Sequence, residues 1–163
     1  MRTLHNIILK SSEHGFTLSW QDRLILSHTA DTPCLWIGAG EADIEMFRGN
    51  LSIKDKLNEK IALTEATVAP QNAGWAIRFT RGDAVSATLL VGVDAEGRLE
   101  LKLKNDASSH NRIWLRLAAQ PEDHIYGCGE QFSYFDLRGK PFPLRTSEQD
   151  VGRNKQNYVT WQA

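Results

Sequence analysis

Apolar and polar residues alternate along several short segments of the chain. Large apolar side chains occupy every second position in residues 16–20, and the same spacing recurs in residues 24–27, 75–79, 99–103 and 113–117. Successive side chains of a β-strand point to opposite faces of a sheet, so this alternation is typical of strands with one buried face. The pattern predicts a chain built mainly of β-strands.

Short polar segments separate the alternating ones and carry residues that favour turns. They lie at residues 13–15, 81–83, 94–97 and 105–109. Strands that recur about every 8 to 12 residues between such turns favour a sandwich or barrel over β-α-β units. Ile53 to Lys60 is the one modest helical candidate, and its many charges fit a solvated turn equally well. We therefore expect an all-β fold.

The length and charge of the chain argue against several classes of protein. Its 163 residues suffice for one ordinary domain, which we expect over residues 1–163. The formal net charge is -1 and neither sign forms a long block, so nucleic acid is a poor candidate partner. No stretch approaches the roughly 20 apolar residues that span a bilayer, and the apolar run of residues 7–9 is too short for a signal peptide. We expect a cytoplasmic protein with no membrane partner.

The cysteines and histidines give no support for a disulfide framework or a metal site. Cys34 and Cys128 lie far apart without CxxC spacing, which favours free thiols. The five histidines are scattered, and none falls in an HxH or HExxH arrangement. The five tryptophans mostly occupy strand-like runs, so core packing is favoured over ligand stacking, with Trp36 the least certain. We expect no metal and no cofactor.

The last residues resemble a strand that begins and then stops. Residues 158–161 read Tyr-Val-Thr-Trp, and the sequence ends at Ala163. A domain end is usually polar and frayed, and a strand without neighbours presents an unpaired edge. We therefore expect an interruption of a longer sequence at this point, while a last edge strand is the alternative.

The stretch from His124 to Gln156 is the densest in residues suited to chemistry. It packs glycines, aromatics and charges together without strand alternation, which is typical of an ordered irregular loop. Gly127 and Gly129 permit close approaches of the backbone that a side chain would block. Glu130 and Gln131 follow with a carboxylate and an amide, the groups that pair with sugar hydroxyls. The pattern indicates a candidate sugar-binding loop.

Other side chains of this stretch have two interpretations each. The aromatics fit either the apolar walls of a saccharide site or a core beneath a surface loop, and core packing is favoured; they are Phe132, Tyr134, Phe135 and Phe142. Arg153 and Lys155 fit an anion contact or, more commonly, a solvated turn. Ordinary glycoside hydrolysis needs two carboxylates, but no spacing holds two of the candidates at a defined separation, so none is assigned a catalytic role; they are Glu130, Asp136, Glu148 and Asp150.

The stretch HNRIWLRLAAQPEDHIYGCGEQFSYFDLRGKPFPLRTSEQDVGRNKQ resembles the late N-terminal region of glycoside hydrolase family 31 enzymes, in particular those of the sulfoquinovosidase kind. The segments RLILSH, CLWIG, DIEMFRGN, SIKDKL and KIALT extend the resemblance over essentially the whole chain. It implies a β-sandwich of the galactose mutarotase-like supersandwich type, truncated at its C-terminal end. In that family a (β/α)₈ barrel follows the sandwich and carries both catalytic aspartates of a retaining mechanism. The resemblance thus implies that residues 1–163 form an incomplete domain, inactive alone because the barrel is absent.

The resemblance also implies which residues contact substrate. In such enzymes the GEQ loop packs near the mouth of the barrel and helps to shape the sugar pocket. Carried over to this sequence, the loop gives Gly129, Glu130 and Gln131, with Arg138 and Arg153 as weaker supports. No catalytic residue, metal ligand or cofactor is implied for this chain.

Two positions depart from the family's pattern. Arg145 stands where a tryptophan is expected, and Asp150 stands where a glycine is expected. If the backbone needs a positive dihedral there, Asp150 costs on the order of 1 kcal/mol, although aspartate tolerates that region better than most residues.

Three functions remain open from the sequence. The first is an accessory β-domain of a retaining α-glycosidase, acting on a sulfoquinovoside or an α-glucoside in the full enzyme. The second is a stand-alone carbohydrate-binding module that uses Glu130, Gln131 and nearby aromatics. The third is an interaction protein that self-associates through the exposed strand edge at its C-terminus.

Overall fold

The computed structural model describes residues 2–4, 6–47, 50–71, 74–82, 85–106, 109–126 and 134–140. This part of the chain contains eleven strands and no helix, and therefore no helix that is long and apolar enough to cross a membrane. The strands are β1 (Arg2–Leu4), β2 (Ile7–Ser12), β3 (Gly15–Trp20), β4 (Arg23–Thr29), β5 (Leu35–Phe47), β6 (Asn50–Ala62), β7 (Glu65–Gln71), β8 (Gly74–Arg81), β9 (Val85–Val93), β10 (Leu99–Asn105) and β11 (Arg112–Leu115). The all-β prediction is confirmed.

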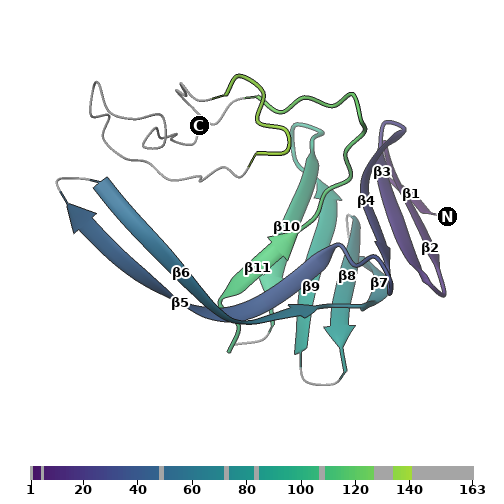
Figure 1. The fold of residues 1–163 in the computed structure, drawn as a ribbon. Helices are drawn as coiled ribbons and strands as arrows, with labels where there is room; N and C mark the ends of the chain where they lie inside the picture. Colours follow the sequence, from purple (N-terminus) through teal and green to yellow (C-terminus); the bar gives the residue numbers. More distant parts are fainter. Residues whose placement is uncertain are drawn as a thin grey trace. The chain divides into compact units, whose positions relative to one another are not determined.

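The strands form three sheets (Figure 1). The first has the order β1-β2-β3-β4, the second β10-β9-β8-β7 and the third β11-β5-β6. Neighbours in the first two sheets pair antiparallel, as do β11 and β5. Because most neighbours in a sheet are also neighbours in sequence, short turns suffice to connect them, which agrees with the turn signals read from the sequence.

The chain divides into two compact units. The first consists of Met1–Glu41 and Lys56–Ala119, and the second of Ala42–Asp55 and Gln120–Ala163. Strands β5 and β6 run through both units, because each begins in one and ends in the other. The expectation of one incomplete domain over residues 1–163 stays a prediction.

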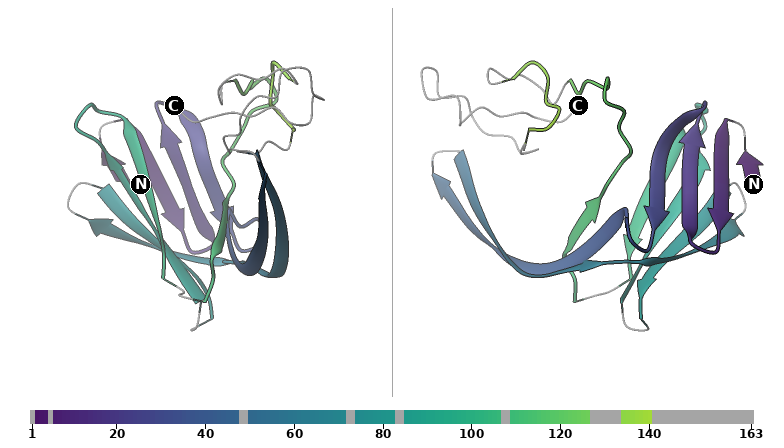
Figure 2. Two further views of the ribbon diagram at one scale, coloured as in Figure 1. Left: turned by 90° about the vertical axis from the view of Figure 1, so that its left-hand side faces the viewer. Right: turned by 45° about the vertical axis from the view of Figure 1, so that its right-hand side comes forward.

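The hydrophobic core lies in the first unit, between the β1–β4 sheet and the β7–β10 sheet, which Figure 2 shows facing each other. The side chains that alternate inward along β3 and β8 meet there, and the Phe16 and Phe79 rings pack edge to face at 5.8 Å. The inward residues of these two strands are almost completely buried; they are Phe16, Leu18, Trp75, Ile77 and Phe79. The alternation in residues 16–20 and 75–79 was therefore a correct guide to both strand and buried face.

The connection between β3 and β4 is a two-residue turn with an unusual backbone. Gln21 and Asp22 have φ values of 47° and 66°, and neither is a glycine. Positive φ at both central residues is what a type I′ hairpin requires, because that turn matches the right-handed twist of the flanking strands. The hairpin therefore keeps its geometry at some cost in local backbone strain.

The structure corrects the interpretation of Ile53 to Lys60, which is part of β6 and neither a helix nor a turn. Ile53 and Leu57 are four residues apart, and that spacing places two side chains on the same side of both a helix and a strand. The charged residues between them are exposed on β6, as they would be on a helix. Pairing with β5, which a short segment cannot reveal, decides between the two structures.

The expected alternation of residues 113–117 is correct only in part. Strand β11 ends at Leu115, so Leu117 lies beyond it and is 56% exposed. Ile113 is 41% exposed although it lies opposite the buried Ile37 of β5. Alternation predicted the strand here, but not how far it extends or how well it is covered.

The tryptophans divide between the core and a surface cluster. Trp75 is buried and Trp20 packs against the core, as expected. Trp36 and Trp114, however, lie opposite each other on β5 and β11 and are half-buried. The Lys60 ammonium lies 5.4 Å and 4.6 Å from their ring centroids, which is cation–π geometry. Trp36 is therefore neither a core residue nor an open stacking platform; the fifth tryptophan lies outside the described residues.

Candidate functional site

Within the predicted loop stretch from His124 to Gln156, the carboxylate of Asp136 connects residues on either side of the segment 127–133. One carboxylate oxygen accepts the main-chain N–H groups of Ile125, at 3.1 Å, and Arg138, at 3.0 Å. The other oxygen lies 2.7 Å from Nδ1 of His124. Asp136 thus joins residues that precede the segment 127–133 to residues that follow it.

Arg138 adds a second connection across the same base. Its guanidinium donates a hydrogen bond to the carbonyl of Asp123 at 2.7 Å and another to the carbonyl of Gln120. The N–H of Leu137 donates to the carbonyl of Ile125 at 2.8 Å, and the Leu137 side chain is buried. We call this set of contacts among residues 120–126 and 136–138 the loop clamp. The loop clamp therefore holds residues 120–126 next to residues 136–138.

The loop clamp changes the electrostatics of its central residue. The hydrogen bond from His124, followed by those from the N–H groups of Arg138 and Ile125, lowers the pKa of Asp136 to about 2. All three donors prefer the charged carboxylate, so the aspartate stays ionised well below its ordinary range. Asp136 should therefore keep its charge in acid that protonates carboxylates with ordinary pKa values.

Aromatic side chains surround the clamp on its exposed side. The ring of Tyr126 stacks on His124 at a centroid distance of 5.9 Å and lies 5.1 Å from the ring of Phe135, tilted by 53°. Phe135 is 89% exposed and Tyr134 is 51% exposed, with Lys140 4.9 Å from the centroid of Tyr134. The expectation that these aromatics form a core beneath the loop is therefore wrong for Tyr134 and Phe135. Sequence spacing could not decide this, because an aromatic residue is equally common in a core and in a ligand-binding wall.

The predicted site residues are located only in part. Arg138 is half-buried in the loop clamp, where its described partners are main-chain carbonyls. Gly129, Glu130, Gln131 and Arg153 lie outside the described residues, so their contact with a sugar stays a prediction. The same holds for several other residues that the sequence pointed to, namely Cys128, Phe132, Phe142, Arg145, Glu148, Asp150 and Lys155.

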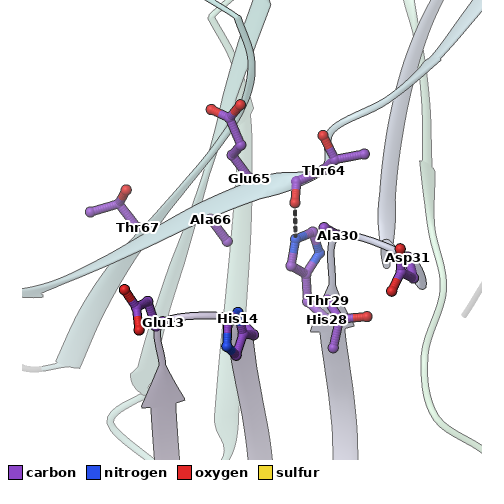
Figure 3. Close-up of a pocket in the computed structure, with 11 residues that line it drawn as sticks. Glu13, His14, His28, Thr29, Ala30, Asp31, Thr64, Glu65, Ala66 and Thr67 are labelled. Atoms are coloured by element: carbon purple, nitrogen blue, oxygen red, sulfur yellow. Dashed lines mark hydrogen bonds between the residues drawn. The ribbon is translucent and has the colours of Figure 1, made fainter.

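A second candidate site is a cavity of about 440 Å³ in the first unit, between the β2–β3 turn, the end of β4 and the start of β7 (Figure 3). Its lining includes the carboxylates of Glu13, Asp31 and Glu65 and the hydroxyls of several threonines, but no lysine or arginine. Three acidic groups disfavour an anionic ligand such as a sulfonate. Among the described residues, no group of His, Cys, Asp and Glu side chains is arranged to hold a metal ion.

The floor of this cavity is the buried imidazole of His28. Its Nδ1 accepts the main-chain N–H of Cys34 at 3.3 Å, so its Nε2 carries the proton and donates to the carbonyl of Thr64 at 3.3 Å (Figure 3). The ring stacks on Phe16 at 5.5 Å and meets the edge of Phe79 at 5.2 Å. Burial lowers the pKa of His28, against the opposing effect of the Thr64 hydrogen bond. His28 is therefore a neutral structural residue with both ring nitrogens engaged.

Cys34 lies directly beside this histidine. Its thiol is buried and free, 3.6 Å from Nδ1 of His28, and burial raises its pKa to about 11. A thiol with so high a pKa is a poor nucleophile near neutral pH. Sequence reasoning did not single out the His28–Cys34 pair, although Leu26 and His28 alternate on the inward side of β4. The expected alternation does not extend to Leu24, because the β3–β4 pairing shifts register there and Ile25 packs against the core instead.

Comparison with known proteins identifies the class. Residues 11–160 match the model of the glycosyl hydrolase 31 N-terminal galactose mutarotase-like domain, so the chain belongs to that family. Its 149-residue match to a sulfoquinovosidase of Escherichia coli is 73% identical and covers 91% of this chain and 22% of the relative. A sulfoquinovosidase of Agrobacterium fabrum is 38% identical over 94% of the chain and likewise 22% of the relative. The chain thus spans about a fifth of the length of these relatives.

A solved structure agrees with the fold. A family 31 sulfoquinovosidase from E. rectale, solved in complex with the aza-sugar inhibitor IFGSQ, superposes with a TM-score of 0.73 at 36% identity. The match covers 93% of this chain and 22% of that protein. The resemblance to glycoside hydrolase family 31 and the sandwich fold expected from it are both confirmed.

Proposed function

We propose that this chain is the N-terminal accessory domain of a retaining α-glycosidase that acts on sulfoquinovosides. The single observation that carries the proposal is the 73% identity to the E. coli sulfoquinovosidase across 91% of the chain. In family 31 the two carboxylates of the retaining reaction belong to the barrel. The chain would supply no catalytic residue and would act by shaping the sugar pocket.

The loop clamp supports a specific role for residues 127–133. A binding loop discriminates between ligands only if its ends are held, because a loop that must be ordered on binding loses affinity to entropy. Asp136 and Arg138 hold both ends through five hydrogen bonds. Glu130 and Gln131 lie in the middle of the segment, where they would accept from and donate to sugar hydroxyls.

A chimeric enzyme tests this function. This chain would replace the matching region of the E. coli sulfoquinovosidase, and hydrolysis of a sulfoquinovoside would be measured. A hydrogen bond to a charged group contributes about 1.5–3 kcal/mol, so Glu130→Gln should lower kcat/KM at least about tenfold. The matched control is Glu122→Gln, an exposed glutamate before the loop, which should change kcat/KM less than about twofold.

Each outcome bears on the proposal. An active chimera with a selective effect of Glu130→Gln supports it. Equal activity of both variants and the parent would remove the loop from the sugar pocket. Isothermal titration of the isolated chain addresses the alternative function: saturable heat with a sulfoquinovoside, but none with a matched α-glucoside, would favour a stand-alone carbohydrate-binding module.

A further inference from the structure

The paired strands β5 and β6 extend beyond the sheet to which they belong. Strand β11 pairs with residues 35–38 of β5, and the side chain of Asn111 hydrogen-bonds to the main chain of Gly40. Among the described strands, only β6 lies beside β5 beyond Gly40. We call residues 42–47 of β5 and 50–55 of β6 the ribbon arm; the two strands run alongside each other in Figures 1 and 2. Every side chain of residues 42–47 is exposed, and so are those of residues 52–55.

The two faces of the ribbon arm differ in chemistry. Ile44 and Met46 lie on one side of β5 and are 59% and 73% exposed, whereas Asp43 and Glu45 alternate to the other side. On β6, Ile53 is 44% exposed and Lys54 points to the opposite side. Ile44 and Met46 thus form an apolar side of β5, whereas its opposite side is charged except at Phe47, which is 71% exposed. On β6, Asp55 follows Ile53 on the same side.

The register places the apolar sides together. A Cβ added to Gly40 would lie 3.4 Å from the Cα of Leu57, so these two residues face each other across the strands. Equal numbers of residues separate Gly40 from Ile44 and Ile53 from Leu57, so regular antiparallel pairing from Gly40 onward would set Ile44 opposite Ile53. Ile44, Met46 and Ile53 therefore share one face, which we call the apolar face of the arm, and Asp43, Glu45 and Lys54 share the other.

Such a ribbon needs a partner for its apolar face. A two-stranded hairpin is marginally stable in water, because one face must be buried before the pairing is secure. Exposed apolar side chains gathered on one face, with charges on the opposite face, indicate a protein-interaction surface. The opposite, mainly charged face would stay exposed to water when the apolar face is covered.

The partner of the apolar face can be inferred from the part of the relatives that lies outside the match. The chain belongs to an N-terminal domain family and spans 22% of its two sulfoquinovosidase relatives, so more than three quarters of each relative lies outside the match. Self-pairing of two arms edge to edge is disfavoured by the lysines along β6, at residues 54, 56 and 60. We propose that the apolar face of the ribbon arm docks on the catalytic portion of the full-length enzyme. This inference rests on the proposed function.

Hydrogen exchange of the arm amides tests the docking. It is measured on this chain alone and on the chimera in which this chain precedes the remainder of the E. coli sulfoquinovosidase. Docking should slow exchange of residues 42–47 and 50–55 at least about tenfold in the chimera. Ile44→Glu with Met46→Glu should remove the added protection, while the opposite-face control, Asp43→Asn with Glu45→Gln, should retain it. If the chimera aggregates, the aligned strands of the natural E. coli enzyme are compared in the same way.

The outcomes separate docking from function. Added protection that only the apolar-face variant removes supports docking, whether or not the chimera hydrolyses sulfoquinovoside. An active chimera whose arm exchanges as fast as in the isolated chain overturns docking and leaves the proposed function intact. A protected arm in an inactive chimera supports docking and counts against the function. Protection of the isolated chain that grows with its concentration, with a dimer in sedimentation, assigns the face to a second copy and overturns the proposal.

Discussion

The imidazole of His28 is held neutral by its surroundings. It accepts from Cys34, donates to Thr64 and lies between two phenylalanine rings. A second proton would have to replace the N–H that Nδ1 accepts, inside an apolar environment that disfavours charge. The fold therefore depends on a histidine that does not titrate in its usual range.

A pH dependence of stability follows from His28. Its pKa is lowered in the folded chain, so below about pH 6.5 the unfolded state binds more protons and the free energy of unfolding falls as pH falls. His28→Leu should flatten this dependence between pH 7 and pH 5, and should lower stability at pH 7 by about 1–3 kcal/mol because Cys34 N–H and Thr64 C=O lose a partner. Urea unfolding at both pH values measures both effects. His14→Asn, at an exposed turn, is the control, and an unchanged slope in His28→Leu would contradict the prediction.

Asp136 gives a second prediction at this scale, in a more acidic pH range. Because its pKa is lowered to about 2 in the folded chain, its contribution to stability is present above pH 3.8 and is lost as pH falls through about 2. Asp136→Asn removes the charge that His124 and two N–H groups share. We expect faster hydrogen exchange of the Ile125 and Arg138 amides at pH 7, with Glu122→Gln as the control. Equal exchange in the two variants would show that the clamp does not depend on this carboxylate.

At the scale of elements, the β3–β4 hairpin carries strain that substitution can relieve. Gln21 and Asp22 both have positive φ, where Asn-Gly is the preferred pair. Gln21→Asn with Asp22→Gly should raise the free energy of unfolding by about 0.5–1 kcal/mol, measured by denaturant unfolding. The same residues placed at Ala95 and Glu96, a turn without positive φ at those positions, should destabilise instead. A gain at both turns would refute the strain argument.

Elements also show where sequence reasoning succeeds and where it fails. Alternation predicted β3 and β8 with their buried faces, because both lie in the middle of sheets that cover a core. It failed for Ile53 to Lys60, where both faces are exposed and a four-residue spacing fits either structure. The GEQ loop was found by resemblance, whereas Asp136, which anchors its base, was noticed only as a carboxylate. Its role depends on contacts with residues 11 to 12 positions earlier, which no local pattern encodes.

For the whole molecule, the division into two units has a direct consequence. The residues of the core cluster all lie between Ile7 and Val91, and those packed against it extend only to Leu115. Ala118 donates to the carbonyl of Ile25, so the chain is still tied to β4 near the end of the first unit. None of the described residues beyond 119 belongs to this core cluster.

Removal of residues 120–163 should therefore leave the first unit folded. We expect the shortened chain to keep the β-sheet circular dichroism of the full chain. Its melting temperature should lie within about 5 °C of that of the full chain, because this shift corresponds to a change of about 1 kcal/mol in the free energy of unfolding of a domain of this size. Truncation at residue 84, which removes the buried strand β9, is the control and should abolish cooperative melting. Loss of cooperative melting in the chain that lacks only residues 120–163 would mean that the core depends on the second unit.

Because Cys34 is buried, the reactivity of its thiol can be used to measure transient opening of the core. A reagent that alkylates thiols needs both physical access and the thiolate, and the closed core withholds both. With Cys128 replaced by serine, the rate at which an alkylating reagent consumes the remaining thiol measures how often the sandwich opens. If a sugar or a partner domain binds the folded chain, the sandwich should open less often and alkylation of Cys34 should slow. The alkylation rate would then follow assembly of the domain with its partner.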